Sequence, residues 1–323
     1  MKKFICVLTS VLMILSLFAG CGASQSGSGY RIAIVQQMDH TSLDEIRTAI
    51  EEELADQAAK LGIQITCKVF NGQNDSSVLN QIGTQVVSEG YDAIIPIATL
   101  AAQCMVNAAQ DSGIPVIYAA VSDPAGSGLT GFPTVTGTSD ALNTPFILDM
   151  MLNVDPTIKT VGLLYSNSES NSQLPIAQAI EYLKANGIDF LEKTGNTADE
   201  IITAAGALVG RVDAVFTPTD NVVMGTESAV AEILNAAGIP HYAGADSFVT
   251  AGAFATCGVN YIELGKQTAK MAVEALQTGK VPAHHVMAGG IITVNTETAA
   301  ALELDYSVFS TMANTVKEVT TGE

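Results

Sequence analysis

The chain has 323 residues, with 33 acidic residues against 14 Lys and Arg and a formal net charge of -19. This balance excludes nucleic-acid binding, because a surface that follows phosphates needs clustered basic side chains and the sequence has no such cluster beyond Lys3. The chain is 48% apolar and 15% charged, which excludes intrinsic disorder and suffices for about two domains. We therefore expect an acidic, globular protein with two lobes.

Residues 1–20 have the pattern of an export signal, since two lysines precede an apolar run that is too short for a transmembrane helix. The run ends in Leu-Phe-Ala-Gly before Cys21, which resembles the lipobox of bacterial lipoproteins, where the cysteine is lipidated. An ordinary signal peptide followed by a chance cysteine is the alternative. Residues 21–29 are small and are expected to form a flexible, lipidated tether. This pattern places the protein on the outer face of a bacterial cell membrane, anchored by lipid.

Three further cysteines, Cys67, Cys104 and Cys257, lie in the part expected to fold. An odd number of cysteines without CxxC or Cys/His spacing argues against a disulfide framework and against a zinc site. We expect all three to be small buried apolar residues. No metal or cofactor is expected.

Strand-like and helix-like patterns alternate from residue 31 onward. Arg31–Val35 contains a continuous apolar run, typical of a strand covered on both faces. Apolar residues then recur at helical spacing from Leu43 to Leu61, and Gly62 ends that helix. Further strands are expected near residues 63–69, 93–97 and 114–118, with helices between them. This alternation predicts parallel sheets with right-handed crossovers.

The same order then repeats about 120 residues later. Lys159–Tyr165 is the counterpart of Arg31–Val35, and Gly238-Ile239-Pro240 repeats Gly113-Ile114-Pro115, with two further echoes between them in the same order. The fold class predicted from this repeat is α/β, with two doubly wound parallel-sheet lobes.

The lobes are expected to be joined by a three-segment hinge, partly by analogy. The polar segment Thr136–Asn143 lies between the repeats and forms the first crossover. A helix over residues 262–276 is expected to return to the first lobe, and a strand at 291–294 to the second. The first lobe then comprises residues 30–141 plus 257–282, and the second comprises residues 142–256 plus 283–323.

Polar residues follow most of the predicted strands. In open parallel sheets, ligands bind beyond the carboxyl ends of the strands, so these residues are the candidate site. Hydroxyls and amides at helix N-termini, such as Thr99, Asn171 and Ser172, favour an anion, whereas Asp123, Glu169, Asp220 and Asp246 offer carboxylates to a cation. A cleft that holds groups for both an anion and a cation suits a zwitterion such as an amino acid. For any single residue, an ordinary helix N-cap is an equal alternative.

Catalytic patterns are absent from the sequence. Gly126–Gly131 formally matches GxGxxG, but Phe132-Pro133 follows instead of a helix. There is no Walker A sequence and no GxSxG elbow, and the four histidines lack metal spacing. Only His40 falls at a strand end, as a ligand contact or as a plain loop residue. We therefore expect no enzyme activity and no catalytic residues.

The strand-end segments together resemble one family, the aromatic amino-acid-type substrate-binding proteins of ABC transporters, a lipoprotein branch with the type I periplasmic-binding fold. The matching segments include Ile97-Ala98-Thr99, Ala119–Pro124, Ser168–Ser172, Pro218–Asn221 and Tyr261 with Leu264-Gly265. The resemblance implies a monomeric receptor that closes on an amino acid, Trp, Phe or Tyr, and delivers it to ABC permease subunits without catalysis.

Carried over position by position, the resemblance implies ligand contacts at Gln36, His40, Thr99, Ser122 and Asp123 in the first lobe, and at Tyr165, Glu169, Asn171, Ser172, Asp220 and Asp246 in the second. Thr99, Asn171 and Ser172 would hold the ligand's carboxylate, and Asp220 or Asp246 would take its ammonium group. Thr41 stands where relatives often have proline, so the preferred ligand side chain stays open. The alternatives are the same fold binding a sugar or nucleoside, and a ligand-sensing lipoprotein without a permease.

Overall fold

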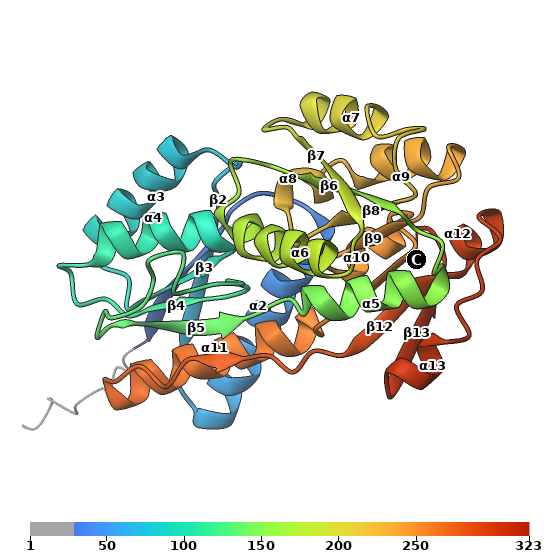
Figure 1. The fold of residues 1–323 in the computed structure, drawn as a ribbon. Coiled ribbons are helices and arrows are strands. Elements are labelled where there is room, and N and C mark those ends of the chain that lie inside the picture. Colours follow the sequence, from blue (N-terminus) through green and yellow to red (C-terminus); the bar gives the residue numbers. More distant parts are fainter. Residues whose placement is uncertain (1–28, 323) are drawn as a thin grey trace, which may run out of the picture.

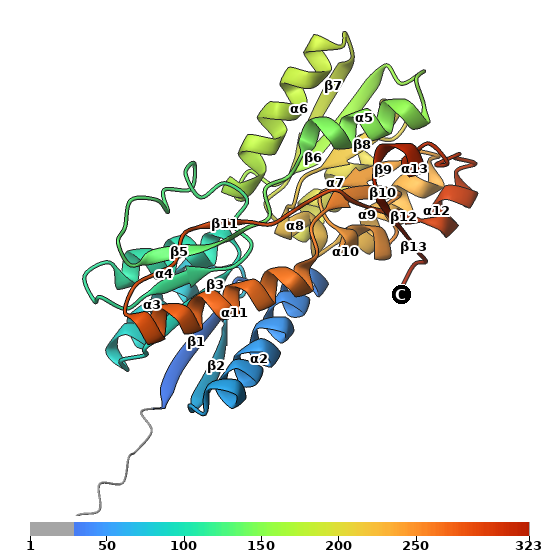
Figure 2. The same cartoon turned by 90° about the horizontal axis from the view of Figure 1, so that it is seen from below.

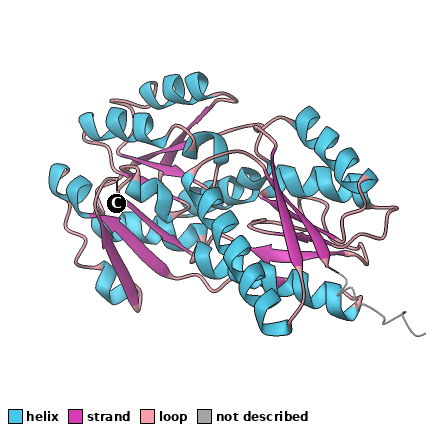
Figure 3. Cartoon of the chain, turned by 180° about the vertical axis from the view of Figure 1, so that it is seen from behind, coloured by secondary structure: helices cyan, strands magenta, loops and turns pink. Residues whose placement is uncertain are grey.

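Two β-sheets, each with helices on both faces, form the two lobes of the chain (Figures 1 and 3). The computed structural model describes residues 29–322. The predicted signal segment, residues 1–20, and the predicted lipidation site Cys21 lie outside the described residues, as does the predicted tether apart from Gly29. None of the helices in the described part combines the length and the apolar character needed to span a bilayer.

The first sheet has the strand order β11-β5-β4-β3-β1-β2 within residues 29–322, and all neighbouring strands run parallel. The predicted apolar run lies in β1, between two neighbouring strands, and is fully buried from Ile32 to Val35. Because both faces of this strand are buried, its apolar residues do not alternate with polar ones. The elements are β1 (Tyr30–Gln36), α2 (Thr41–Leu61), β2 (Ile65–Asn71), α3 (Ser76–Ser88), β3 (Ala93–Ile97), α4 (Thr99–Ala109), β4 (Val116–Tyr118) and β5 (Val135–Ser139).

The second sheet has the order β13-β12-β10-β9-β8-β6-β7 in the described part, and is parallel except between β10 and β12. Its lobe contains α5 (Thr144–Val154), β6 (Thr160–Tyr165), the 3-10 helix η1 (Ser170–Ser172), α6 (Gln173–Ala185), β7 (Asp189–Thr194), α7 (Ala198–Gly206), β8 (Ala214–Thr217), α8 (Asn221–Met224), α9 (Glu227–Ala236), β9 (His241–Ala243), α10 (Asp246–Thr250) and β10 (Ala255–Gly258). The C-terminal elements are α11 (Tyr261–Thr278), β11 (His285–Val286), β12 (Ile291–Asn295), α12 (Thr296–Ala301), α13 (Phe309–Met312) and β13 (Thr315–Val319).

The two sheets share one strand order, which is the internal repeat predicted from the sequence. In each sheet the first strand of the lobe, β1 or β6, lies between the second and the third strand. The order therefore reverses at β1 and at β6, and these switch points are where open parallel sheets bind ligands. The predicted α/β class with two parallel-dominated sheets is confirmed.

The chain passes between the sheets three times, and α11 returns to the first lobe to pack against α2 (Figure 2). The passages follow β5, β10 and β11. Cys257 and Gly258 belong to β10 of the second sheet, and β11 pairs with β5 of the first. The second crossover, expected at residue 257, thus follows the end of β10 at Gly258. The third, expected at residue 283, follows the end of β11 at Val286.

The helix predicted from Leu43 to Leu61 is α2, and it ends at the expected glycine. Gly62 has φ 65° and donates its N–H to the carbonyl of Ala58, a left-handed cap that glycine adopts without a steric penalty. Leu43 and Ile46 are buried on the face of α2 that leads into the cleft. The cap therefore fixes where α2 ends, and the apolar face fixes which side of its first turn meets the cleft.

The expectation of three buried cysteines is wrong for one of them. Cys104 and Cys257 are buried, but Cys67 is exposed. Cys67 lies on β2, the strand at the edge of the first sheet, most of whose residues are exposed. The alternating apolar pattern of this segment predicted a strand but could not tell an edge strand from a central one. All three thiols are free.

Candidate functional site

The candidate site lies between the lobes, at the carboxyl ends of the strands that flank both switch points. A cavity lined by residues of both lobes lies there. Its polar lining comes from His40, Ser42, Thr99, Ser122, Asp140, Asn171, Thr219, Asp220 and Asn221, and its other lining residues are Leu43, Ile46, Ala98, Ala120, Met224, Ala245, Phe248 and Tyr261. A concave site with a largely apolar wall and a few convergent polar groups is the usual form of a small-molecule site.

Two alanines in the wall of the cavity have backbone conformations that side chains disfavour. Ala98 has φ 76° between β3 and α4, and Ala120 has φ 55° just after β4. Positive φ at a residue other than glycine costs on the order of 1–3 kcal/mol and concentrates at functional sites. The strain occurs where Thr99 and Ser122 are presented to the cavity.

The lobes touch directly across the cleft. Gln37 donates from its amide to Glu169 at 2.8 Å, and His40 Nε2 lies 3.0 Å from Asn221 Oδ1. The hydroxyls of Ser42 and Ser247 are also in hydrogen-bond contact, as are those of Ser122 and Thr219 at 3.2 Å. Each pair joins one residue of the first lobe to one of the second, so the lobes are closed on each other.

Glu169 lies at the centre of these interlobe contacts. It is buried, and its two carboxylate oxygens accept from the amides of Gln37 at 2.8 Å and Asn221 at 2.6 Å. Burial is the main reason that the pKa of Glu169 is raised to about 7, and the negative charge of the nearby Asp220 is the second. Burial thus favours the protonated form of this carboxyl more than in an exposed glutamate.

The pKa of Glu169 makes stability depend on pH with a defined sign. A carboxyl whose folded-state pKa is raised stabilises the folded form below its unfolded value of 4.5, and that contribution is lost as pH rises through about 7. As pH rises from about 5 to about 8, the wild-type protein should therefore lose stability relative to Glu169→Gln, by on the order of 3 kcal/mol. Thermal unfolding of both proteins across this range measures it, and a difference that does not change with pH would contradict the prediction.

The hydrogen bonds around His40 define which of its ring nitrogens carries the proton. Asn221 donates its amide to Glu169, so its Oδ1 faces His40 and accepts from Nε2–H. Burial lowers the pKa of His40, which favours the neutral ring. Nδ1 is then an acceptor, and it is buried with no hydrogen-bond partner among residues 29–322. His40, which lines the cavity, therefore keeps one unused acceptor.

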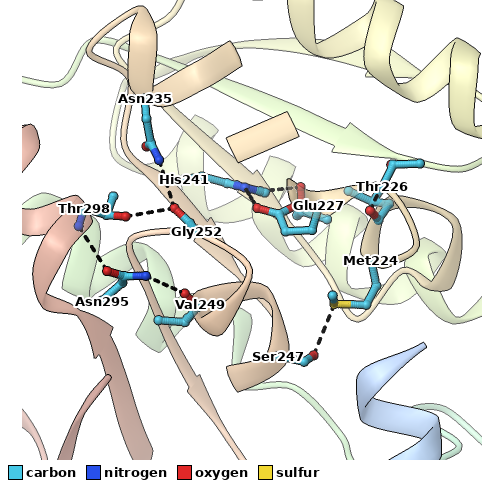
Figure 4. A network of polar contacts seen from close by, with 12 residues as sticks. Met224, Thr226, Glu227, Asn235, His241, Ser247, Val249, Gly252, Asn295 and Thr298 are labelled. Carbon is cyan, nitrogen blue, oxygen red and sulfur yellow. Dashed lines mark hydrogen bonds and ion pairs between the residues drawn. The ribbon is translucent and has the colours of Figure 1, made fainter. Parts of the chain in front are cut away.

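A second buried polar network supports the strands behind the site (Figure 4). His241 on β9 contacts Glu227 Oε1 through Nδ1 and Thr217 Oγ1 through Nε2, each at 2.8 Å, and both His241 and Glu227 are fully buried. Thr217 ends β8, two residues before the cavity residue Thr219. The same figure shows Ser247 donating to the sulfur of Met224, which lines the cavity. This network ties the carboxyl end of β8 to the first residue of β9.

Of the residues expected in the site, five line the cavity: His40, Thr99, Ser122, Asn171 and Asp220. Glu169 and Ser172 do not line the cavity but are hydrogen-bonded to residues that do. Glu169 accepts from Asn221, and Ser172 donates to Asp220. Gln36 is turned toward α2, where its amide donates to Asp44 and accepts from Arg47.

Three expected residues are directed elsewhere. Tyr165 donates to Glu192 at 2.7 Å, and Asp123 accepts from the backbone of Gly126 in a turn. Asp246 lines a separate cavity of about 470 Å³ near the hinge, together with Glu45 and Lys317. These side chains are not among those that line the cavity between the lobes.

Sequence reasoning missed Asp140 and the apolar wall. Asp140 directly follows β5, so the strand-end rule that selected its neighbours could have found it, but the segment was assigned to the hinge. Leu43, Met224 and Phe248 have the apolar character of ordinary core residues. No pattern in the sequence distinguishes an apolar residue that faces a cavity from one that faces the core.

Comparison with known proteins is consistent with this architecture. One family model, described as "ABC transporter substrate binding protein", matches residues 31–314. A tyrosine-binding protein of Clostridioides difficile (strain R20291) is 31% identical over 94% of this chain and 93% of its own length. A structure from Streptococcus pneumoniae in complex with L-Trp is 29% identical, with a TM-score of 0.83 over 90% of this chain and 100% of the other.

A ligand-free, open structure from Clostridium difficile, of a substrate-binding protein with adhesive properties, gives a lower TM-score of 0.67. Its identity to this chain is 32%, over 90% of this chain and 99% of the other. The lower score at similar identity indicates that the lobes are arranged more as in the L-Trp complex than as in the open form. This agrees with the direct interlobe hydrogen bonds.

Proposed function

Because the chain belongs to the family of ABC transporter substrate-binding proteins, we propose that it binds an aromatic amino acid between its lobes and delivers it to an ABC permease. Proteins of this family bind substrates outside the cytoplasm and are not enzymes. The observation that carries the proposal is a cavity between two lobes in direct contact, lined by apolar and polar side chains from both lobes.

The apolar part of the lining supports an aromatic ligand. Leu43 and Ile46 come from α2 of the first lobe, and Met224 and Phe248 come from α8 and α10 of the second. An aromatic side chain between these residues would gain from apolar burial and from contact with the Phe248 ring and the Met224 sulfur. The related tyrosine-binding protein and L-Trp complex point to the same ligand class.

The polar part of the lining supports an amino-acid backbone. Thr99 begins α4, an 11-residue helix whose first backbone N–H groups and dipole favour an anion. The hydroxyls of Thr99 and Ser122 and the amide of Asn171 add side-chain donors from both lobes. These groups suit a carboxylate, and the unused acceptor of His40 suits a donor such as a phenol, an indole or an ammonium group.

In this proposal the protein is exported by residues 1–20 and anchored through a lipid on Cys21. Ligand binding selects the closed arrangement of the lobes, and the closed form is the one that docks on the permease. The interlobe contacts of Glu169 and Asn221 would form only in that state. The protein acts as a monomer.

A thermal-shift screen tests the proposal. The purified protein is dialysed and heated with each of the twenty amino acids, with sugars and nucleosides as controls. A ligand at a hundred- to thousandfold excess over its dissociation constant stabilises the folded protein by roughly 3–4 kcal/mol. We expect shifts with Tyr, Trp or Phe only, confirmed by calorimetric titration. A shift only with sugars or nucleosides would overturn the ligand class.

A further inference from the structure

Two buried carboxylates line the cavity, and they differ in how many hydrogen bonds they already accept. Asp220 accepts four: from Ser166 N and Ser172 Oγ at 2.7 Å on Oδ2, and from the N–H groups of Val222 at 3.1 Å and Val223 at 3.0 Å on Oδ1. A carboxylate has about four lone-pair sites. Asp220 is therefore saturated by its own lobe, as the N-cap of α8.

Asp140 accepts only one side-chain hydrogen bond on each oxygen. Ser122 Oγ donates to Oδ1 at 2.9 Å, and the hydroxyl of Tyr261 donates to Oδ2 at 3.2 Å. Asp140 is 5% exposed and forms no ion pair within residues 29–322, and no lysine or arginine is among the residues that line the cavity. Its side-chain partners thus leave acceptor capacity unused, and its carboxyl has no cationic partner in the described part of the chain.

We propose that Asp140, and not Asp220, receives the ammonium group of the bound ligand. The proposal rests on the proposed function, an amino-acid ligand, and it makes Asp140 the residue that selects amines against sugars and simple carboxylic acids. A buried carboxylate gains from a cation both by charge and by charge-assisted hydrogen bonds. Asp220 then has a different role, which is to hold η1, α8 and the end of β6 together.

The position of Asp140 also connects ligand binding to closure. Asp140 lies in the first crossover, and Tyr261 lies just after the second, so their hydrogen bond joins two segments of the hinge. Ser122 joins Asp140 to Thr219 of the second lobe. Asp140 is therefore linked to both lobes only when they are closed. An ammonium group bound to Asp140 would contact this link.

Titration calorimetry with matched ligands tests the assignment. L-tyrosine is compared with 3-(4-hydroxyphenyl)propionate, and L-tryptophan with indole-3-propionate, since each second compound lacks only the amine. The wild-type protein should prefer the amino acid by about 100-fold or more, the size expected for a buried charge pair. Asp140→Asn should lose this preference, because its affinity for the amino acid falls about 100-fold while that for the analogue changes little. The amide keeps one acceptor for Ser122 or Tyr261, so the fold should be retained.

Asp220→Asn is the matched comparison. In this variant the new side-chain amide would face backbone donors, so the thermal midpoint of the protein should fall. The variant should still prefer the amino acid over the analogue without the amine. If Asp140→Asn does not fold, Asp140→Ser removes the charge with a smaller side chain. Unchanged preference in a folded Asp140 variant, or loss of preference in Asp220→Asn alone, would overturn the assignment while leaving the proposed function intact. Absence of any aromatic amino-acid binding by the wild-type protein would overturn both.

Discussion

Replacing His241 by leucine is expected to lower the free energy of unfolding by about 3–5 kcal/mol, because it removes one partner of a buried pair. His241 and Glu227 are both fully buried, and within residues 29–322 the imidazole is the only hydrogen-bond partner of the Glu227 carboxylate. Burial already raises the pKa of Glu227. Without His241, that carboxyl would have to be protonated or remain unpaired in the core. Chemical denaturation monitored by circular dichroism measures the loss.

The double variant His241→Leu with Glu227→Met is the control for this prediction. Replacing a whole buried pair by apolar side chains of similar size is often nearly neutral, whereas breaking it is not. The double variant should therefore be more stable than His241→Leu alone. If instead the two losses simply add, the pair is not a coupled unit and the stated reason for the destabilisation is wrong.

Gly265→Ala is expected to destabilise the first lobe by about 1–3 kcal/mol, although alanine is normally favoured over glycine in a helix by about 1 kcal/mol. A Cβ at Gly265 would lie 2.7 Å from the carbonyl oxygen of Ile46 and 2.8 Å from the Ala49 Cβ. Glycine here allows α11 to approach the backbone of α2 closely. Because Ile46 lines the cavity, ligand affinity should fall together with stability.

The matched control is Gly206→Ala at the end of α7. A Cβ there meets nothing within 4 Å, so the substitution should be neutral or stabilise by up to about 1 kcal/mol. Thermal unfolding of both variants separates helix propensity from steric overlap. Equal midpoints for the two variants would show that α2 yields to the added methyl group at little cost.

Much of the fold was predictable from the sequence because it depends on local periodicity. The buried run Ile32–Val35 and the helical spacing that ends at Gly62 are local patterns, and β1 and α2 follow them closely. The repeat of these patterns predicted two lobes of one topology, and the shared strand order agrees. The strand-end rule also selected His40, Thr99 and Asn171, because parallel strands bring their carboxyl ends to one edge.

Other features depended on contacts between segments far apart in the sequence. Cys67 was expected to be buried, but β2 is an edge strand, a property of the whole sheet. The pairing of His241 with Glu227 joins a strand to the helix before it, and no spacing rule predicts it. Asp140 and Tyr261 lie 121 residues apart and meet only because two hinge segments run together.

Composition and local pattern were enough to predict the α/β class, the repeat and the acidic character of this protein. The difference between the two aspartates on which the ammonium proposal rests could be seen only in the folded chain. Asp140 and Asp220 are the same residue type at similar strand-end positions, and they differ in the donors that other segments bring to them. Free acceptor capacity is what remains after folding has satisfied the backbone and its neighbours, so it is a property of the closed structure and not of the sequence pattern.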